Sequence, residues 1–326
     1  MKILFIGGTG NISLSTSQQL IGHGHDLWLC NRNTPLAGAH HIACDINNES
    51  EAQQKLKGHH WDVVVNWVGF TAEHALRDIR LFNGHCKQYV FISSASCYQN
   101  PGPTLFITEE RTLENPHWQY SRDKIAAEEA LFLAYQESGF PITVVRPSHT
   151  YSTVIPLTIG AWTNYNTIAR IKKGLPIVVQ GDGTSLWTLT HARDFAKGFI
   201  GLLGNTAAIG EAVHITSDEV LDWNTIYQQT AAALGKTANI VHLASDTICK
   251  IIPEETGSLL GDKAVSALFD NSKIKRLVPD FKAVIPYAEG IKETLEWFEA
   301  DASRQVIDAK EEALIERLVR TAGQDQ

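Results

Sequence analysis

The first 150 residues alternate short apolar runs with longer segments of helical periodicity. The apolar runs are rich in β-branched residues and span residues 2–7, 26–31, 62–68, 89–93 and 142–147. Continuous apolar character is typical of strands that are buried on both faces. The segments between them predict helices near 12–22, 49–57, 71–84 and 118–138. This alternation predicts the α/β class, with a doubly wound parallel sheet covered by helices on both sides.

The pattern changes after Pro147. Residues 186–190 and 212–216 predict strands that return to the first domain, with a helix near 192–204 between them. The remainder predicts one strand and several helices, at 239–243, 160–173, 222–234, 245–252, 287–299 and in the tail 303–322. A chain of 326 residues is long enough for two domains. We expect one domain from 1–153 plus 186–216, and a smaller C-terminal α/β substrate domain from 154–185 plus 217–326.

Composition limits the classes of function. The chain has 28 Lys and Arg against 36 Asp and Glu, a net charge of −8, which argues against a nucleic-acid partner. No apolar run approaches the ~20 residues of a membrane span, and glycines interrupt the apolar start before it reaches signal-peptide length. The five cysteines lack CxxC spacing, and the pairs His40-His41 and His59-His60 are expected in solvated loops, so no metal site is predicted. We expect a cytoplasmic protein that acts on a small molecule.

A glycine loop follows the first strand. The loop Gly7-Gly8-Thr9-Gly10-Asn11-Ile12-Ser13 lies where strand 2–7 turns into helix 12–22. Gly7 permits the tight turn, and Gly10 lets the backbone approach a pyrophosphate at the free N–H groups of the helix N-terminus. In this context the loop predicts a Rossmann-type site for NAD or NADP, with cofactor contacts from Gly7, Thr9, Gly10, Asn11 and Ile12.

The end of the second strand bears on the choice of cofactor. An acid about 20 residues beyond the loop would bind the ribose 2′-hydroxyl of NAD, but here the strand ends in Asn31-Arg32. Asn31 can bond a hydroxyl and Arg32 can pair with a 2′-phosphate, so both cofactors stay open and Arg32 favours NADP. Asp45 and Ile46 are placed to meet the adenine edge. The end of the next strand should run beside the cofactor, through Asn66, Trp67 and Val68.

Tyr120 and Lys124 lie four residues apart in a strongly helical stretch, which puts both side chains on one face. A lysine ammonium beside a phenol favours the phenolate, so Tyr120 would act as an acid and base well below its ordinary pKa of about 10. Ser94 follows strand 89–93 at the carboxyl edge of the sheet, where ligands of open α/β folds bind. Its hydroxyl can hold the substrate oxygen that gains or loses a proton.

This ordered set of motifs resembles the extended short-chain dehydrogenase/reductases, the NAD-dependent epimerase/dehydratase family. The resemblance implies that Ser94, Tyr120 and Lys124 are catalytic, and that Lys124 also holds the nicotinamide ribose. It implies that Pro147 and Ser148 lie near the nicotinamide carboxamide. It also suggests a homodimer packed through the helices near 71–84 and 118–138. The motifs are GGTGNIS (7–13), FISSASCY (91–98), YSRDK (120–124), TVVRPSHTYS (143–152), GDG (181–183) and HARDFAKG (191–198).

Several positions depart from the family pattern. Sugar 4,6-dehydratases carry an Asp-Glu pair after the catalytic serine or threonine, where this chain has Ala95-Ser96, so a 4,6-dehydratase is not expected. Substrate contacts are expected from Ser96, His149 and Trp187. The other departures concern cofactor preference and substrate fit, and they are Ser13, Asn31, Gln99 and Ser152.

Two classes of function follow. We expect an epimerase or a dehydrogenase/reductase that acts on a hydroxyl or ketone of a sugar or nucleotide sugar by Tyr-assisted hydride transfer. The alternative is a non-catalytic member of the same superfamily that senses nucleotides or binds RNA. Such a member would be expected to lose the Tyr120–Lys124 pair or to gain a basic surface.

Overall fold

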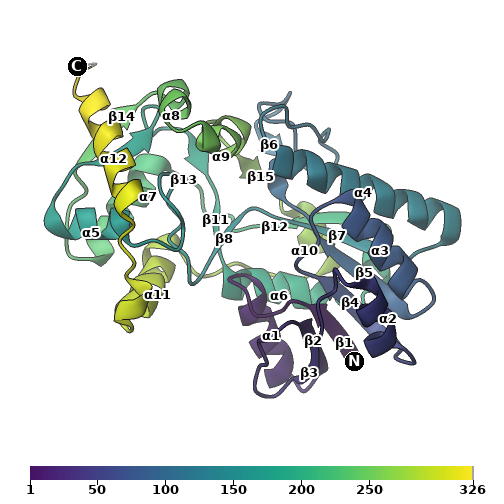
Figure 1. Cartoon of the computed structure of the whole chain (residues 1–326). Coiled ribbons are helices and arrows are strands. Elements are labelled where there is room, and N and C mark those ends of the chain that lie inside the picture. The colour runs from purple at the N-terminus through teal and green to yellow at the C-terminus, as the bar shows by residue number, and fades with distance from the viewer. Residues whose placement is uncertain (325–326) are drawn as a thin grey trace.

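A seven-stranded parallel sheet forms the larger part of the computed structural model, which describes residues 1–324 (Figure 1). The strand order is β12-β7-β5-β4-β1-β2-β3, so the direction of winding reverses at β1. The strands are β1 (Lys2–Ile6), β2 (Asp26–Asn31), β3 (His40–Ala43), β4 (Trp61–Asn66), β5 (Cys86–Ile92), β7 (Ile142–Pro147) and β12 (Ala212–Ile215). The predicted doubly wound Rossmann-type sheet is confirmed.

Helices cover both faces of this sheet. α1 (Ser13–Gly22), α6 (Ala192–Leu202) and α10 (Ser272–Leu277) lie on one face, and α2 (Glu49–Leu56), α3 (Ala72–Phe82) and α4 (Gln119–Ser138) on the other. Alternate residues of β1 serve the two faces, since Phe5 packs with Phe199 while Leu4 packs with Leu131. Burial on both sides explains why the strand sequences are continuously apolar.

The pair His40-His41 lies in strand β3, so the expectation of a loop was wrong. Its residues pair with Trp28 and Leu29 of β2, and the His40 ring stacks on Trp28 with centroids 4.3 Å apart. β3 is the edge strand, held by backbone pairing and half solvated, so its sequence need not be apolar. Within residues 1–324, no group of three or more His, Cys, Asp or Glu side chains is arranged to hold a metal ion.

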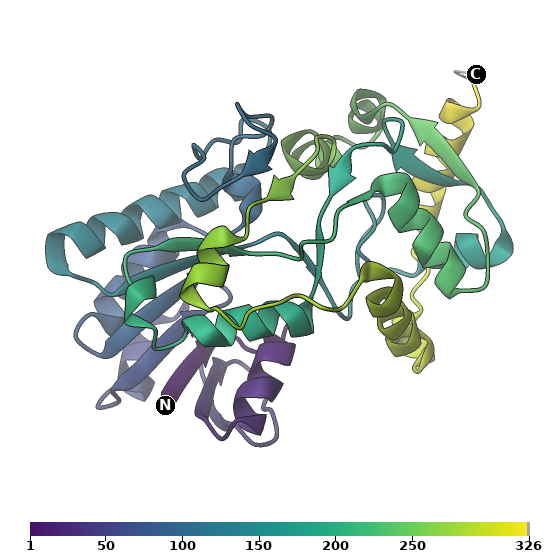
Figure 2. The ribbon, with the colours of Figure 1, turned by 180° about the vertical axis from the view of Figure 1, so that it is seen from behind.

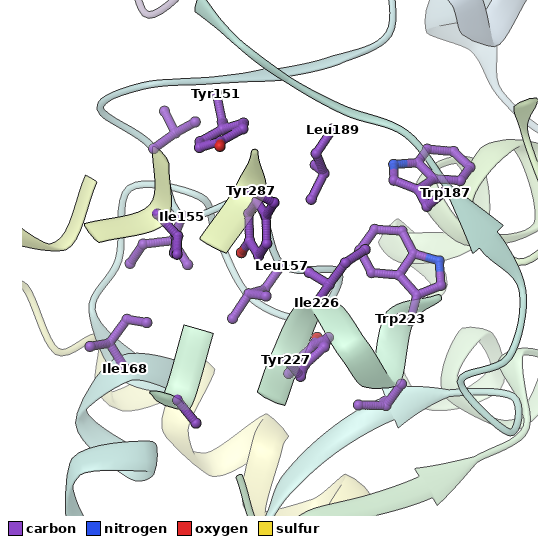
Figure 3. Packing of buried hydrophobic residues seen from close by; sticks show 14 of the residues in the cluster. Tyr151, Ile155, Leu157, Ile168, Trp187, Leu189, Trp223, Ile226, Tyr227 and Tyr287 are labelled. Carbon is purple, nitrogen blue, oxygen red and sulfur yellow. The ribbon is translucent and has the colours of Figure 1, made fainter. Parts of the chain in front are cut away.

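A second lobe lies at the other end of the molecule, where Figure 1 shows α12 on its outer surface. Figure 3 shows its core, in which the rings of Trp187 and Trp223 lie together with centroids 5.4 Å apart, and those of Tyr151 and Tyr287 form a second pair. The pairs β8 (His149–Tyr151) with β11 (Leu189–His191), and β10 (Leu186–Trp187) with β13 (Leu221–Asp222), join the lobes. The other elements are α5 (Asn166–Lys173), β9 (Ile177–Gln180), α7 (Trp223–Ala233), β14 (Ile240–Leu243), α8 (Ser245–Ile251), α11 (Tyr287–Glu299) and α12 (Ala309–Ala322).

The segment around α10 returns to the first lobe, although the sequence placed all of 217–326 in the second. Ile274 and Phe281 are buried in the same core as Phe199, and Figure 2 shows α10 beside α6. Close contact is possible because α6 has glycines here: a Cβ at Gly198 would lie 2.9 Å from the Phe281 ring. β15 (Leu268–Phe269) also pairs with β6 (Phe106–Ile107) of the first lobe. Within the described residues, no helix is long and apolar enough to cross a membrane.

Candidate active site

A cavity of about 590 Å³ lies along the glycine loop, at the carboxyl ends of β1, β2 and β4. We call it the glycine-loop cavity. Gly8 has φ +97°, and a Cβ there would lie 2.7 Å from Leu29 Cδ2, so this position requires glycine. Its lining includes most of the residues predicted to bind the cofactor, namely Gly7, Thr9, Gly10, Asn31, Arg32, Asp45, Ile46, Trp67 and Val68.

The glycine-loop cavity suits a dinucleotide pyrophosphate. α1 starts at the loop, and its N-cap residue Ile12 provides no side-chain hydrogen bond to the first turn. The free N–H groups and the positive end of the helix dipole therefore remain available for an anion. The indole N–H of Trp67 is also buried without a partner among the described residues. These donors fit the group that the sequence predicts.

Asn31 and Arg32 play different parts on the wall of this cavity. The Asn31 amide accepts a hydrogen bond from the Thr34 N–H (2.8 Å) and donates one to the Thr34 carbonyl (3.0 Å), so it holds the 31–34 turn. Arg32 is exposed and makes no hydrogen bond or ion pair within the part of the chain that the structure describes. Arg32 is therefore the charged group free to meet a ligand here.

Asn66 does not line either of the two cavities described here. It is fully buried, and its side-chain oxygen accepts a hydrogen bond from the Val68 N–H at 2.8 Å. Its amide donates to the buried carboxylate of Asp78, which also accepts from the Tyr89 hydroxyl. Asn66 thus shapes the turn that presents Trp67 and Val68 to the cavity.

A second cavity, of about 420 Å³, lies between the carboxyl edge of the sheet and the second lobe. We call it the tyrosine cavity, because Tyr120, in the first turn of α4, is part of its wall. It brings together eight of the predicted site residues: Asn11, Ile12, Ser94, Ser96, Tyr120, Pro147, Ser148 and His149. The Asn11 side chain bonds the Thr150 carbonyl and the Thr153 N–H, so only its backbone is free for a ligand.

Lys124 lies behind the two cavities, one helical turn from Tyr120. Its Nζ donates to the carbonyls of Gly69 (2.6 Å) and Ile92 (2.7 Å) and lies 5.7 Å from the centroid of the Tyr120 ring. Burial lowers the pKa of Lys124 to about 8 and raises that of Tyr120 to about 12, against the opposing effect of the Ser94 hydroxyl. The direction is the opposite of the expected lowering of the Tyr120 pKa, because the effect of burial exceeds that of the Ser94 hydroxyl. At neutral pH, Tyr120 is a phenol that can donate a proton.

Three serine hydroxyls form a chain at the base of the tyrosine cavity. Ser94 Oγ lies 2.8 Å from Ser96 Oγ, which lies 2.7 Å from Ser121 Oγ. Ser121 is fully buried on α4, directly after Tyr120. The chain links the loop after β5 to the helix that carries Tyr120, and it holds the Ser94 hydroxyl in place.

Trp187 does not line the tyrosine cavity. It is 2% exposed, it packs in the core of the second lobe, and its Nε1 donates to His149 Nδ1 at 3.2 Å. An indole N–H can only donate, so His149 Nδ1 is an acceptor, and the proton of the neutral ring is on Nε2. Burial lowers the pKa of His149 well below its ordinary value and keeps the ring neutral.

The cavity wall also contains residues that were not predicted individually, among them two tryptophans and an ion pair. These four come from segments far apart in the sequence, and they are Trp118, Trp162, Asp262 and Lys263. Asp262 and Lys263 end the π-helical turn Leu259–Lys263, which follows the short helix α9 (Thr256–Ser258). For Asp262 and Lys263 the sequence offered one signal, the glycines at 257 and 261 that flank this turn.

A comparison with models of known families shows to which family the chain belongs. The chain matches the model of the NAD dependent epimerase/dehydratase family over residues 3–216. The chain belongs to this family. This match confirms the family that the sequence motifs predicted. It also confirms the prediction of an NAD-dependent enzyme of the epimerase/oxidoreductase type.

Two curated relatives of this epimerase/dehydratase-family chain illustrate the range of functions. The 2′-dehydrokanamycin reductase of Streptomyces kanamyceticus is 25% identical over 291 residues, which cover 86% of this chain and 80% of the reductase. The chloroplast stem-loop binding protein of 41 kDa b of Arabidopsis thaliana is 27% identical over 259 residues, or 74% of this chain and 65% of that protein.

Solved structures of low sequence identity share the fold. A UDP-glucuronic acid 4-epimerase from Bacillus cereus in complex with NAD has a TM-score of 0.73 at 17% identity, with 92% of this chain and 99% of the epimerase covered. The dTDP-glucose 4,6-dehydratase from Bacillus anthracis in complex with NAD has a TM-score of 0.74 at 19% identity, with 93% and 98% covered.

Proposed function

We propose that this chain is a dehydrogenase/reductase that transfers hydride between NADP(H) and a carbon of a sugar bearing a hydroxyl or ketone. The observation that supports this proposal is the meeting of Ser94 and Tyr120 in one cavity with Pro147 and Ser148. Lys124 lies directly behind them. The glycine loop, which fits a dinucleotide, runs into the same wall through Asn11 and Ile12.

The residues of this cavity handle the proton. Tyr120 donates its phenolic proton to the ketone oxygen when the substrate is reduced, and takes the hydroxyl proton when it is oxidised. Ser94 donates a hydrogen bond to the same oxygen and fixes its position. The Lys124 ammonium stabilises the phenolate that remains on Tyr120 after the proton has left. The dinucleotide, when bound, supplies or accepts the hydride.

Arg32 supports the choice of NADP. It is an unpaired, exposed cation on the wall of the glycine-loop cavity, while Asn31 is engaged in its own turn. A guanidinium can bind a 2′-phosphate through two parallel hydrogen bonds. We expect Arg32→Ala to weaken NADPH binding much more than NADH binding, as measured by fluorescence titration of the full-length protein.

An epimerase is the second candidate, since the same residues could return the hydride to the other face of the sugar carbon. The curated relative named a reductase supports the first candidate. Identification of the nucleotide that the denatured protein releases distinguishes the reductase from the epimerase. Stoichiometric NAD(H) would indicate a cofactor kept through turnover, as an epimerase requires, whereas an empty protein that then binds NADPH supports an exchanging reductase.

The alternative is a non-catalytic, RNA-binding member of the superfamily, and the relative named a stem-loop binding protein gives it some support. Two features of this chain favour the enzyme. It keeps Tyr120 and Lys124 in register on one helix, and its net charge of −8 opposes binding to a polyanion.

Replacement of Tyr120 by phenylalanine tests the proposed chemistry. Tyr120→Phe should lower kcat by roughly 10²- to 10⁴-fold, since it removes the general acid, and should leave the Kd of the dinucleotide unchanged. Tyr135→Phe, on the exposed side of α4, is the matched control and should behave as wild type. Full activity of Tyr120→Phe, or failure of the wild-type protein to bind either dinucleotide, would contradict the proposal.

A further inference from the structure

The tyrosine cavity has aromatic walls beyond the reacting tyrosine. The Trp118 ring lies 5.0 Å from Tyr120, and the Trp162 ring stacks on His149 with centroids 4.5 Å apart. Indole faces pack well against the C–H faces of a sugar ring, because both surfaces are flat and apolar. The cavity therefore offers binding surface for a ring next to the group that transfers the proton.

The charges in this cavity are unusual for a site that binds a diphosphate. Its described lining holds one lysine, Lys263, no arginine, and two carboxylates, Asp262 and Glu255. Lys263 is buried, its Nζ lies 3.2 Å from the Asp262 carboxylate, and it lies 5.5 Å and 5.7 Å from the Trp118 and Trp162 rings. Its charge is thus already balanced by neighbours. A nucleotide diphosphate would meet a net negative wall without a free cation.

His149 adds a buried donor to the cavity wall. It is 5% exposed, its Nδ1 is taken by Trp187, and its Nε2 has no partner within the described residues. A buried N–H without an acceptor is costly, and it is commonly satisfied by a ligand or an ordered water. Since His149 forms part of the cavity wall, a hydroxyl or ring oxygen of the substrate is the acceptor that fits.

We infer that the tyrosine cavity binds a sugar without a nucleotide diphosphate, namely a neutral or amino-bearing glycoside. Trp118 and Trp162 pack against its ring, His149 donates to one of its oxygens, and Asp262 binds its amino or hydroxyl groups. The π-helical turn places Asp262 and Lys263 together at the cavity, an arrangement often found at functional sites. This inference rests on the proposed function and narrows its substrate class.

Saturation-transfer NMR on the full-length protein with NADP⁺ tests the inference, because it detects weak sugar binding. The probes are methyl α-glucosaminide, methyl α-glucoside, methyl α-glucuronide and UDP-glucose, at equal concentration. We expect the strongest signal from the amino sugar, a weaker one from the neutral sugar, and the least from the two anionic probes. Trp162→Ala should abolish the signals of probes bound in this cavity without unfolding the protein, since Trp162 is partly exposed.

Asp262→Asn tests the role of charge. The preference for the amino sugar over the neutral sugar should fall about tenfold, the order expected for a hydrogen bond to a charged group. Asp246→Asn, which removes an exposed carboxylate of α8 outside this cavity, is the control and should change nothing.

The inference is overturned if UDP-glucose binds the wild-type protein better than the methyl glycosides, or if none of the four probes binds. It is also overturned if Asp262→Asn leaves the order of the probes unchanged. Each of these results can be distinguished experimentally from a failure of the proposed function. Dinucleotide binding and the loss of turnover in Tyr120→Phe do not depend on which sugar enters the cavity.

Discussion

Lys124 places a positive charge where water cannot solvate it. Within residues 1–324, its ammonium donates hydrogen bonds to two backbone carbonyls, those of Gly69 and Ile92, and burial lowers its pKa from 10.5 to about 8. Between these two values the unfolded chain binds more protons than the folded protein, so stability rises with pH in this interval. Below pH 8 the full cost of burying the charge is present. The protein keeps a destabilising lysine beside Tyr120, the proposed acid–base residue.

Lys124→Met removes this dependence on pH. The free energy of unfolding of the wild type, relative to the variant, should rise by about 2 kcal/mol between about pH 7 and pH 9.5. Urea unfolding at both pH values measures the difference, and the variant should also lose turnover. The exposed lysine Lys57, replaced by methionine, is the control and should show no such trend. A difference that stays constant with pH would show that the pKa of Lys124 is not lowered.

The serine chain makes a second prediction for single residues. Ser96 is hydrogen bonded to both Ser94 and Ser121, so Ser96→Ala frees the Ser94 hydroxyl to rotate. We expect kcat to fall roughly five- to tenfold with little change in KM, since a neutral hydrogen bond contributes about 1 kcal/mol. Steady-state kinetics separates the two constants. The exposed serine Ser138, replaced by alanine, should leave both unchanged, and a change in KM alone would favour direct substrate contact by Ser96.

Among secondary-structure elements, the loop of the second lobe at 256–263 packs directly on the start of α4. Asn115 makes this connection: its Nδ2 donates to the carbonyls of Ser96 (2.9 Å) and Gly261 (2.7 Å), and its Oδ1 accepts from the Trp118 N–H (3.0 Å). Gly257 lies so close that a Cβ would be 2.2 Å from the Trp118 ring. One buried amide thus ties the segment after β5 and the start of α4 to residues 256–263.

Asn115→Ala should loosen this loop. The variant leaves several buried backbone groups without partners, which should cost about 2–3 kcal/mol in the free energy of unfolding. Hydrogen–deuterium exchange should rise in 256–263 and 115–119 and stay as in wild type in β1 and β4. Asn83→Ala, at the exposed C-terminal end of α3, is the control. Unchanged exchange in 256–263 would show that Asn115 does not hold the loop.

For the molecule as a whole, the outer helices α3 and α4 pack on each other and leave apolar groups in solvent. Leu76 on α3 is 48% exposed, and Leu133 on α4 is 52% exposed. The family resemblance suggested these two helices as a dimer interface. Exposed leucines on adjacent helices agree with that prediction, because burial of apolar surface drives association.

We predict a homodimer of twice the 36.0 kDa chain mass in light scattering coupled to size-exclusion chromatography. Leu133→Glu should shift the protein toward monomer, because it introduces a charge into the apolar contact. Leu105→Glu is the control, since Leu105 is exposed but lies in a loop away from these helices. A wild-type monomer, or a dimer that withstands Leu133→Glu, would contradict this interface.

The local pattern of the chain was sufficient to predict most of the fold. Apolar strands alternating with amphipathic helices predicted the parallel sheet, and the boundaries of α4 and α11 agree closely with their predicted segments. The same holds for the glycine loop and for the spacing of Tyr120 and Lys124, because strand and helix geometry relates residues a few positions apart. Strand β3 escaped prediction because an edge strand in solvent carries no apolar signal.

Only the tertiary structure decided which distant side chains share a cavity. Packing of the second lobe brought Asp262 and Lys263 to the cavity of Tyr120 and buried Trp187 behind His149. Packing of α3 on the sheet in the first lobe drew Asn66 into the network around Asp78. The tertiary structure also decided the direction in which the Tyr120 pKa shifts, because burial is a property of the folded chain and not of sequence spacing. Contacts between side chains of different elements depend on how whole elements pack, and local periodicity carries no record of that packing.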